Sequence, residues 1–192
     1  MKFNLRHVIA FLLLIALSIG FGFGFDAIAT AIEESNHPRP EELNESVVEN
    51  AKAFGIPEAV IWSTVKNGSD FASNAVSDRG EIGLMQISPE RFDRICTELL
   101  SENPDARMLY DPETNLRAGS AWISYLYGRY GIWEHVYAAY FAGTEQVDAW
   151  LGDASLLSEQ GVLTDIPDEA TAAYVEDMTD AVECYTKLYY QT

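Results

Sequence analysis

The segment Gly80–Pro89, GEIGLMQISP, contains the residues whose types and spacing best suit ligand chemistry. Gln86 places a neutral amide among apolar residues, and an amide both donates and accepts hydrogen bonds, as sugar hydroxyls require. Gly83 allows another group to approach the backbone closely. These residue types leave two interpretations open: a ligand-binding loop, or a tight turn that uses its glutamine structurally.

Two aromatic clusters extend this pattern. The chain has 10 Tyr, 9 Phe and 4 Trp, and the clusters are WISYLY at residues 122–127 and YAAYF at residues 137–141. Aromatic faces pack against the apolar faces of sugar rings, so both clusters are candidates for a carbohydrate-binding cleft. Packing in a hydrophobic core is the alternative for each ring.

Helical patterns that would position these residues dominate the chain and predict a mainly α fold. Ser88-Pro89 and Asp111-Pro112 each place a capping residue before a first-turn proline. Gly68 is expected to end its helix in a left-handed conformation. Residues 69–82 have no sustained period and predict a loop with at most a small hairpin. We expect helices over 47–54, from Pro57 to Gly68, 88–100, 111–131, 133–141, 145–151 and 167–190.

The charge balance limits the class of partner. The chain has 30 Asp and Glu against 12 Lys and Arg, a net charge of −18 that disfavours nucleic acid. It indicates either a solvated acidic surface or a surface for cationic polymers or Ca²⁺, although no EF-hand spacing is present. An apolar fraction of 48% excludes a disordered chain, and the length suits one domain.

The first 29 residues are typical of a signal peptide or membrane anchor. Lys2 and Arg6 precede the charge-free run Val8–Phe25, and Ala27-Ile28-Ala29 offers a cleavage site. Basic residues on the N-terminal side predict that the rest of the chain lies outside the cytoplasm. Residues 30–44 are polar, acidic and contain proline, so we expect a linker there, followed by one domain over 45–192.

The two cysteines, Cys96 and Cys184, lie in apolar helical patterns. Outside the cytoplasm they are able to form a disulfide, and two buried thiols are the alternative. No further ligands cluster around them, so we expect no metal and no cofactor.

Several motifs occur in an order that fits one family pattern, and this ordered set resembles the catalytic domain of soluble lytic transglycosylases. That domain has a goose-type lysozyme-like fold, and the compact, membrane-associated members of Gram-positive bacteria are the most similar type. The resemblance covers about residues 45 to 190 and implies a helical domain with a cleft for peptidoglycan glycan strands. The matching residues are Ile56-Pro57, Ser69-Asp70-Phe71, Ala75-Val76-Ser77, Gly80 to Pro89, Asp111-Pro112, Asn115-Leu116, Gly119, Ala138 to Gly143, Ile166-Pro167, Thr171 and Tyr174-Val175.

The chain departs from this pattern at three positions that the family uses in its cleft. Gly68 stands where the family has its general acid/base glutamate, Phe141 replaces an asparagine, and Ala170 replaces a second glutamate. In this family one glutamate protonates the glycosidic oxygen and then deprotonates the muramic C6 hydroxyl, which closes a 1,6-anhydro ring. The resemblance implies that the residues in contact with substrate are Ser69, Met85, Gln86, Tyr140, Phe141 and Tyr174.

Three functions follow from these residues. The first is a glycan-binding protein of the cell envelope that has lost cleavage. The second is an active lytic transglycosylase in which another acid replaces the glutamate; Glu81 is the first candidate, and Asp70 and Glu145 are further ones. The third is a structural module that binds another envelope protein.

Overall fold

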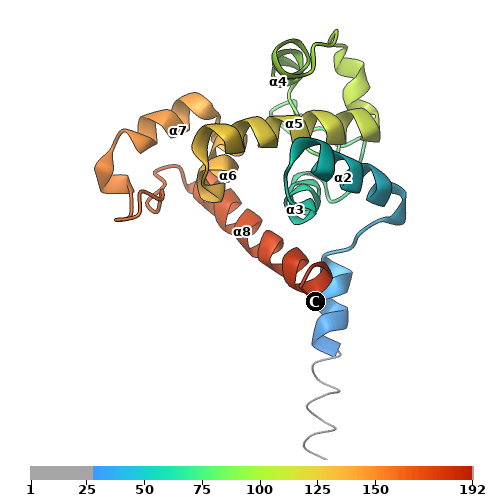
Figure 1. The fold of residues 1–192 in the computed structure, drawn as a ribbon, viewed down its shortest axis with the longest axis horizontal. Coiled ribbons are helices and arrows are strands. Elements are labelled where there is room, and N and C mark those ends of the chain that lie inside the picture. Colours follow the sequence, from blue (N-terminus) through green and yellow to red (C-terminus); the bar gives the residue numbers. More distant parts are fainter. Residues whose placement is uncertain (1–27, 192) are drawn as a thin grey trace, which may run out of the picture. The chain divides into compact units, whose positions relative to one another are not determined.

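The structure is a computed structural model that describes residues 28–191 (Figure 1). The chain divides after Pro38 into two compact units. Residues 28–36 of the first unit are helical, and the predicted anchor run Val8–Phe25 lies outside the described residues. Within residues 28–191, every helix is too short or too polar to cross a bilayer.

The second unit, which begins at Arg39, is helical and confirms the predicted mainly α fold. The part of the chain that the structure describes has no extended strand, only the antiparallel bridges Val76–Ile82, Ile82–Ile87 and Leu157–Leu163. The helices are α2 (Glu41–Phe54), α3 (Glu58–Ser69), α4 (Pro89–Arg94), α5 (Pro112–Tyr130), α6 (Trp133–Ala142), α7 (Thr144–Leu151) and α8 (Glu169–Tyr189). Shorter helical turns are η1 (Ile95–Leu100), η2 (Ala106–Tyr110) and η3 (Ala154–Leu156).

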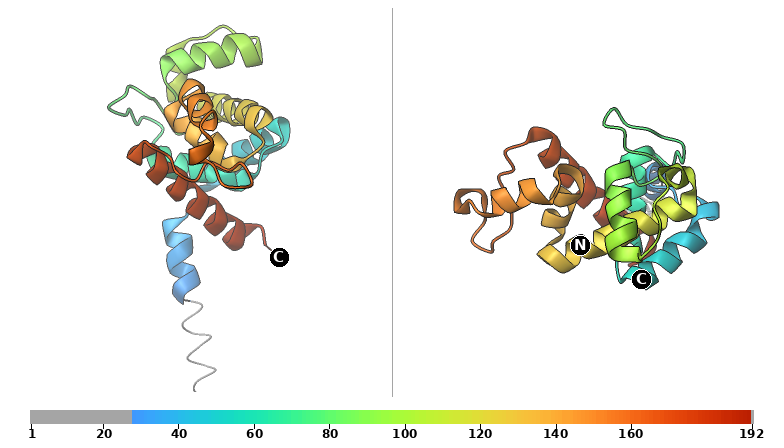
Figure 2. Two further views of the ribbon diagram at one scale, coloured as in Figure 1. Left: turned by 90° about the vertical axis from the view of Figure 1, so that its left-hand side faces the viewer. Right: turned by 90° about the horizontal axis from the view of Figure 1, so that it is seen from above.

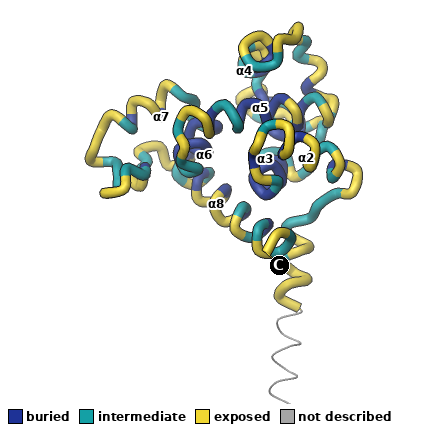
Figure 3. Tube along the Cα trace, in the orientation of Figure 1, coloured by how far each residue is buried: buried dark blue, intermediate teal, exposed yellow. Residues whose placement is uncertain are grey.

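Helix α5 is the central element of this unit. It packs against α2 and α6, while α8 packs against α3 and α6 (Figures 1 and 2). Leu116, Ile123 and Leu126 of α5 are buried, and Figure 3 shows the buried segments gathered in α3, α5 and α6. Burying one such side chain contributes about 1.5–3 kcal/mol, so these contacts fix the positions of the helices that carry the site.

The predicted helix caps are confirmed. The Ser88 hydroxyl accepts a hydrogen bond from the Arg91 amide at 3.2 Å, and the Asp111 carboxylate accepts one from the Thr114 amide at 2.9 Å. Gly131 ends α5 with a φ of 67°. The Ser88 and Asp111 side chains each satisfy an amide that the first turn of a helix leaves unpaired.

The prediction that Gly68 ends a helix is wrong. Helix α3 continues through Gly68 to Ser69, and the exposed Asp70 adopts the left-handed conformation with a φ of 48°. A Cβ on Gly68 would lie 3.3 Å from Cγ of Gln86 and 3.4 Å from the carbonyl oxygen of Leu84. The glycine therefore allows close packing between α3 and the Gly80–Pro89 segment, while Asp70, a residue type that tolerates positive φ, ends the helix.

Two helix starts also differ from the prediction. Helix α2 begins at Glu41, inside the segment predicted as a linker, and Glu41 and Glu42 place negative charge in its first turn, which the helix dipole favours. Helix α8 begins at Glu169 rather than Pro167, since the Asp168 carboxylate accepts a hydrogen bond from the Thr171 amide at 2.8 Å.

The alternative of a disulfide is not the arrangement seen. Cys96 is a free thiol buried in η1, and Cys184 lies half-buried on α8. The interpretation of Cys96 as a buried thiol is confirmed, and burial raises its pKa, which keeps it in the neutral thiol form.

Candidate functional site

One buried amide holds the loop that carries Gln86. Asn115 of α5 is fully buried, and its Nδ2 donates to the carbonyl oxygens of Ile82 at 2.9 Å and Leu109 at 2.8 Å. Its Oδ1 accepts a hydrogen bond from the Met85 amide at 2.7 Å. A buried polar side chain with every group paired fixes its neighbours, so this asparagine determines where the loop lies.

Two glycines make this close packing possible. Gly83 has a φ of 82°, and a Cβ there would lie 2.2 Å from Nδ2 of Asn115. A Cβ on Gly119 of α5 would lie 2.3 Å from the sulfur of Met85. The close approach predicted at Gly83 is thus confirmed, and the approaching group is a side chain of the protein itself.

Gln86 combines both interpretations that its sequence context left open. Its Nε2 donates to the Gly83 carbonyl at 2.7 Å and to the Ala75 carbonyl at 3.4 Å, which is a structural role. Its Oε1 accepts no hydrogen bond from the described residues. The backbone φ of 50° is one that residues with a Cβ adopt at a cost of about 1–3 kcal/mol. The amide nitrogen is thus used within the protein, and the amide oxygen is available to a ligand.

A cavity of about 160 Å³ lies beside Gln86, between α3, the loop, α6 and α8. Sites that enclose a whole small ligand usually measure about 300–1,000 Å³, so only part of a larger ligand fits here. The cavity brings together Gly68, Glu81 and every residue predicted to contact substrate except Ser69. Its lining residues are Thr64, Asn67, Gly68, Ser77, Arg79, Glu81, Met85, Gln86, Tyr140, Phe141 and Tyr174.

Glu81 is the one carboxyl group in this lining, and it is only 9% exposed. Its Oε2 accepts hydrogen bonds from the Ser77 hydroxyl at 3.2 Å and from Nε and Nη2 of Arg79 at 3.2 and 3.0 Å. All three donors therefore reach the same carboxylate oxygen. The geometry thus uses Oε2 of Glu81 as the acceptor that holds Arg79 and Ser77 in place.

Three stacked side chains form another wall of the cavity. The Arg79 guanidinium lies 4.3 Å from the ring centre of Phe141, and that ring stacks on Tyr174 with centres 4.8 Å apart. The Arg79 side chain is 52% exposed. Sequence reasoning missed Arg79, Thr64, Asn67 and Ser77, and the only local signal for Arg79 was its position two residues before Glu81.

The two tyrosines of the cavity are neutral groups. The Tyr140 hydroxyl donates to the Met85 carbonyl at 2.7 Å, whereas the Tyr174 hydroxyl has no hydrogen-bond partner among residues 28–191. Burial raises the pKa of both phenols, so both stay protonated at neutral pH. Tyr174 is therefore free to donate to a ligand. Across residues 28–191, no three His, Cys, Asp or Glu side chains converge as a metal site requires.

The remaining predicted residues lie outside the lining. The Ser69 hydroxyl donates to the Leu84 carbonyl at 2.8 Å and fastens α3 to the loop. Asp70 forms an ion pair with Lys66, and its side chain is 75% exposed. Glu145 is exposed in the first turn of α7. A role of Ser69 in substrate binding stays a prediction, and neither Asp70 nor Glu145 shares the cavity with Gly68.

Known proteins resemble this chain in sequence and fold. Residues 45–160 match the family model described as "Transglycosylase SLT domain". The soluble lytic murein transglycosylase of Escherichia coli K12 is 28% identical over 138 residues, which cover 70% of this chain and 21% of that protein.

Two solved structures share the fold. The lytic transglycosylase Slt of Pseudomonas aeruginosa, described as an inactive mutant with glutamine in place of one glutamate, superposes with a TM-score of 0.70 at 27% identity. The superposition covers 80% of this chain and 25% of the Pseudomonas aeruginosa chain. The 70 kDa soluble lytic transglycosylase of E. coli gives a TM-score of 0.75 at 24% identity, covering 83% of this chain and 26% of that one. The chain therefore spans about a quarter of these solved proteins, and the predicted lysozyme-like helical fold is confirmed.

Proposed function

Since the chain belongs to the Transglycosylase SLT domain family by its residues 45–160, we propose that it binds peptidoglycan glycan strands and has lost or nearly lost their cleavage. The observation that carries this proposal is the cavity beside Gly68, whose one carboxyl group, on Glu81, is committed to Arg79 and Ser77. The cavity keeps groups that hold a sugar, while the position that resembles the family's proton donor has no side chain.

The loss of cleavage follows from proton transfer. A positioned acid or base contributes about 10²–10⁴-fold to a rate, and a glycosidic oxygen leaves poorly unless it is protonated. The relative from P. aeruginosa is described as inactive after one glutamate became glutamine, so in that protein a single carboxyl group is indispensable. A glycine has no side chain and therefore offers neither the proton of a glutamate nor the hydrogen bonds of a glutamine.

Binding is supported by the groups that remain available. Gln86 has an unused amide oxygen and Tyr174 an unused hydroxyl among residues 28–191. The stacked pair of Phe141 and Tyr174 provides an apolar face of the kind that sugar rings pack against. We propose that these residues, with Met85 and Tyr140, contact the glycan.

Co-sedimentation with purified murein sacculi tests this binding. The variant Tyr174→Phe removes one hydroxyl from the cavity, and Tyr127→Phe removes one from an exposed ring outside it. One hydrogen bond contributes about 0.5–1.5 kcal/mol, so we expect Tyr174→Phe to weaken binding roughly 2- to 10-fold and Tyr127→Phe to leave it unchanged. A wild-type chain that stays in the supernatant, or two variants that bind alike, contradicts the proposal.

A second function is an active lytic transglycosylase in which Glu81 replaces the missing acid. The observation that favours it is that Glu81 is nearly buried and lines the same cavity as Gly68. Release of 1,6-anhydromuropeptides by the wild type, together with its loss in Glu81→Gln, supports this alternative. Release that survives Glu81→Gln excludes Glu81 as the acid.

The setting of the protein is also part of the proposal. We propose an extracytoplasmic location, with residues 1–29 as signal peptide or anchor, and with the segment 30–44, predicted as a linker, passing into the glycan-binding domain at Glu41, where α2 begins. The resemblance to compact, membrane-associated proteins of Gram-positive bacteria supports an anchored form. A module that only binds another envelope protein remains the third candidate, supported by the net charge of −18.

A further inference from the structure

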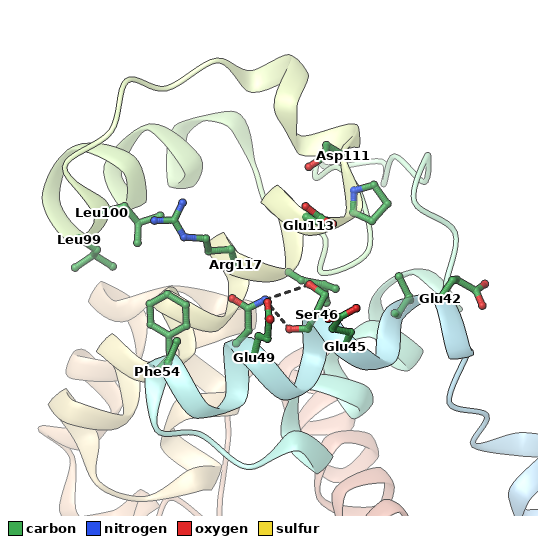
Figure 4. A pocket seen from close by; sticks show the side chains of 15 residues that line it. Glu42, Glu45, Ser46, Glu49, Phe54, Leu99, Leu100, Asp111, Glu113 and Arg117 are labelled. Carbon is green, nitrogen blue, oxygen red and sulfur yellow. Dashed lines mark hydrogen bonds between the residues drawn. The ribbon is translucent and has the colours of Figure 1, made fainter.

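A second, larger hollow lies between α2, η1 and the first turns of α5, and we name it the α2–α5 groove (Figure 4). It measures about 1060 Å³ and shares no lining residue with the cavity beside Gln86. Its function is therefore separable from glycan binding. Two of its walls come from α2 and α5, which pack against each other, so the groove is part of the rigid unit.

Acidic side chains line the groove, and Figure 4 shows them projecting from both helices. No Lys or Arg among residues 28–191 forms an ion pair with any of them. Arg117 is the one cation in the lining, and it already pairs with Glu102 at 2.6 Å. The groove therefore presents negative charge that no Lys or Arg of residues 28–191 neutralises, with Asp111 also serving as the cap of α5. The acidic residues are Glu42, Glu45, Glu49, Asp111 and Glu113.

Apolar side chains and one buried amide complete the groove. Phe54, Leu99 and Leu100 are half-buried and line it next to the fully buried Leu116. Asn50 is only 9% exposed, and its Nδ2 donates to the Ser46 carbonyl at 2.8 Å. Its Oδ1 receives no hydrogen bond from residues 28–191. Because this oxygen is accessible rather than fully buried, it offers the groove an acceptor that a donor on a ligand can use.

We propose that the α2–α5 groove binds a basic amphipathic segment of another protein. The unused polar groups of the groove are acceptors and anions, so the complementary occupant donates hydrogen bonds and carries positive charge. The half-buried leucines and phenylalanine require an apolar side on the same occupant. A metal ion fits less well, because no three carboxylates of the described residues converge on one point. This inference does not depend on what the other cavity binds.

The test measures binding of labelled synthetic peptides to the full chain, kept in nonionic detergent, by fluorescence anisotropy. The probe is an amphipathic helix of Lys and Leu, and the comparison peptide contains Lys and Gln in the same order. The double variant Glu45→Gln/Glu49→Gln removes two groove charges, and Glu176→Gln/Asp180→Asn removes two exposed charges from α8. All four positions are exposed on helices, so thermal unfolding verifies that both variants stay folded.

We expect the groove variant to bind the Lys–Leu peptide roughly tenfold more weakly, which corresponds to about 1.4 kcal/mol, and the α8 variant to lose less than about twofold. The Lys–Gln peptide is expected to bind more weakly to the wild type at about 0.15 M salt, where exposed charges are screened. Carbodiimide cross-links from the peptide lysines should map to Glu45, Glu49 and Glu113. Equal loss in both variants, equal binding of the Lys–Gln peptide or of spermine, or cross-links spread over α8 overturns the proposal.

Discussion

Replacing Asn115 by alanine should cost about 3–5 kcal/mol of the free energy of unfolding. The side chain is fully buried and makes hydrogen bonds of 2.7, 2.8 and 2.9 Å to the backbone of Met85, Leu109 and Ile82. Each buried backbone group left without a partner costs about 1–3 kcal/mol, and water that enters the vacated space recovers part of the sum. The result is a large share of the roughly 5–15 kcal/mol that stabilises a typical domain.

Urea unfolding followed by circular dichroism measures this cost, and two variants separate hydrogen bonding from packing. Asn115→Asp keeps the shape but replaces the donor to Ile82 and Leu109 by an oxygen, so we expect it to be no more stable than Asn115→Ala. Asn50→Ala is the matched control, since the amide of this nearly buried asparagine serves only Ser46 of its own helix. We expect the control to lose less than about 1 kcal/mol. If Asn115→Asp is as stable as the wild type, the reasoning about the loop is refuted.

Two further predictions concern crowding and pH. Gly119→Ala should lower the free energy of unfolding by about 1–3 kcal/mol, because its Cβ would lie 2.3 Å from the sulfur of Met85. Gly128→Ala on the same helix, where a Cβ would meet nothing within 4 Å, should raise it by up to about 1 kcal/mol. Urea unfolding of both variants measures these changes. Burial lowers the pKa of His135 below its usual 6.5, and its Nε2 accepts a hydrogen bond from the Leu163 amide at 3.0 Å. The unfolded chain therefore binds the proton more tightly, so the contribution of His135 to the free energy of unfolding is fully present above about pH 6.5 and is lost as the pH falls below it. Unfolding measured at stepwise lower pH should show this loss, and the loss should be smaller in His135→Gln.

The helices were predictable because their signals are local. Ser88 and Asp111 cap helices with side chains three residues from the amides they satisfy, and Gly131 ends α5 by its own φ. The fate of Gly68 was not predictable in this way. A glycine near the end of a helix either ends it or allows close packing, and here the outcome depends on Gln86, which arrives from a later loop.

The site was predictable only in part for the same reason. Met85, Gln86 and Tyr140 follow from the ordered motifs, and the cavity does bring them together. The stacking of Arg79 on Phe141 joins a loop to a distant helix, and no pattern in the sequence encodes that contact. The exclusion of Ser69 likewise depends on a carbonyl group, that of Leu84, whose position the fold alone determines.

The most direct test of the account is the yield of 1,6-anhydromuropeptides from purified sacculi, measured by mass spectrometry for the wild type and for Gly68→Glu. A Cβ at Gly68 would lie 3.3 Å from Cγ of Gln86 and 3.4 Å from the carbonyl oxygen of Leu84, so a side chain there requires Gln86 to move by a few tenths of an ångström. We predict that the wild type gives no more product than a buffer control and that Gly68→Glu gives a measurable yield. A wild-type yield well above the control, abolished by Glu81→Gln, would contradict the claim that this cleft holds glycan without a working acid.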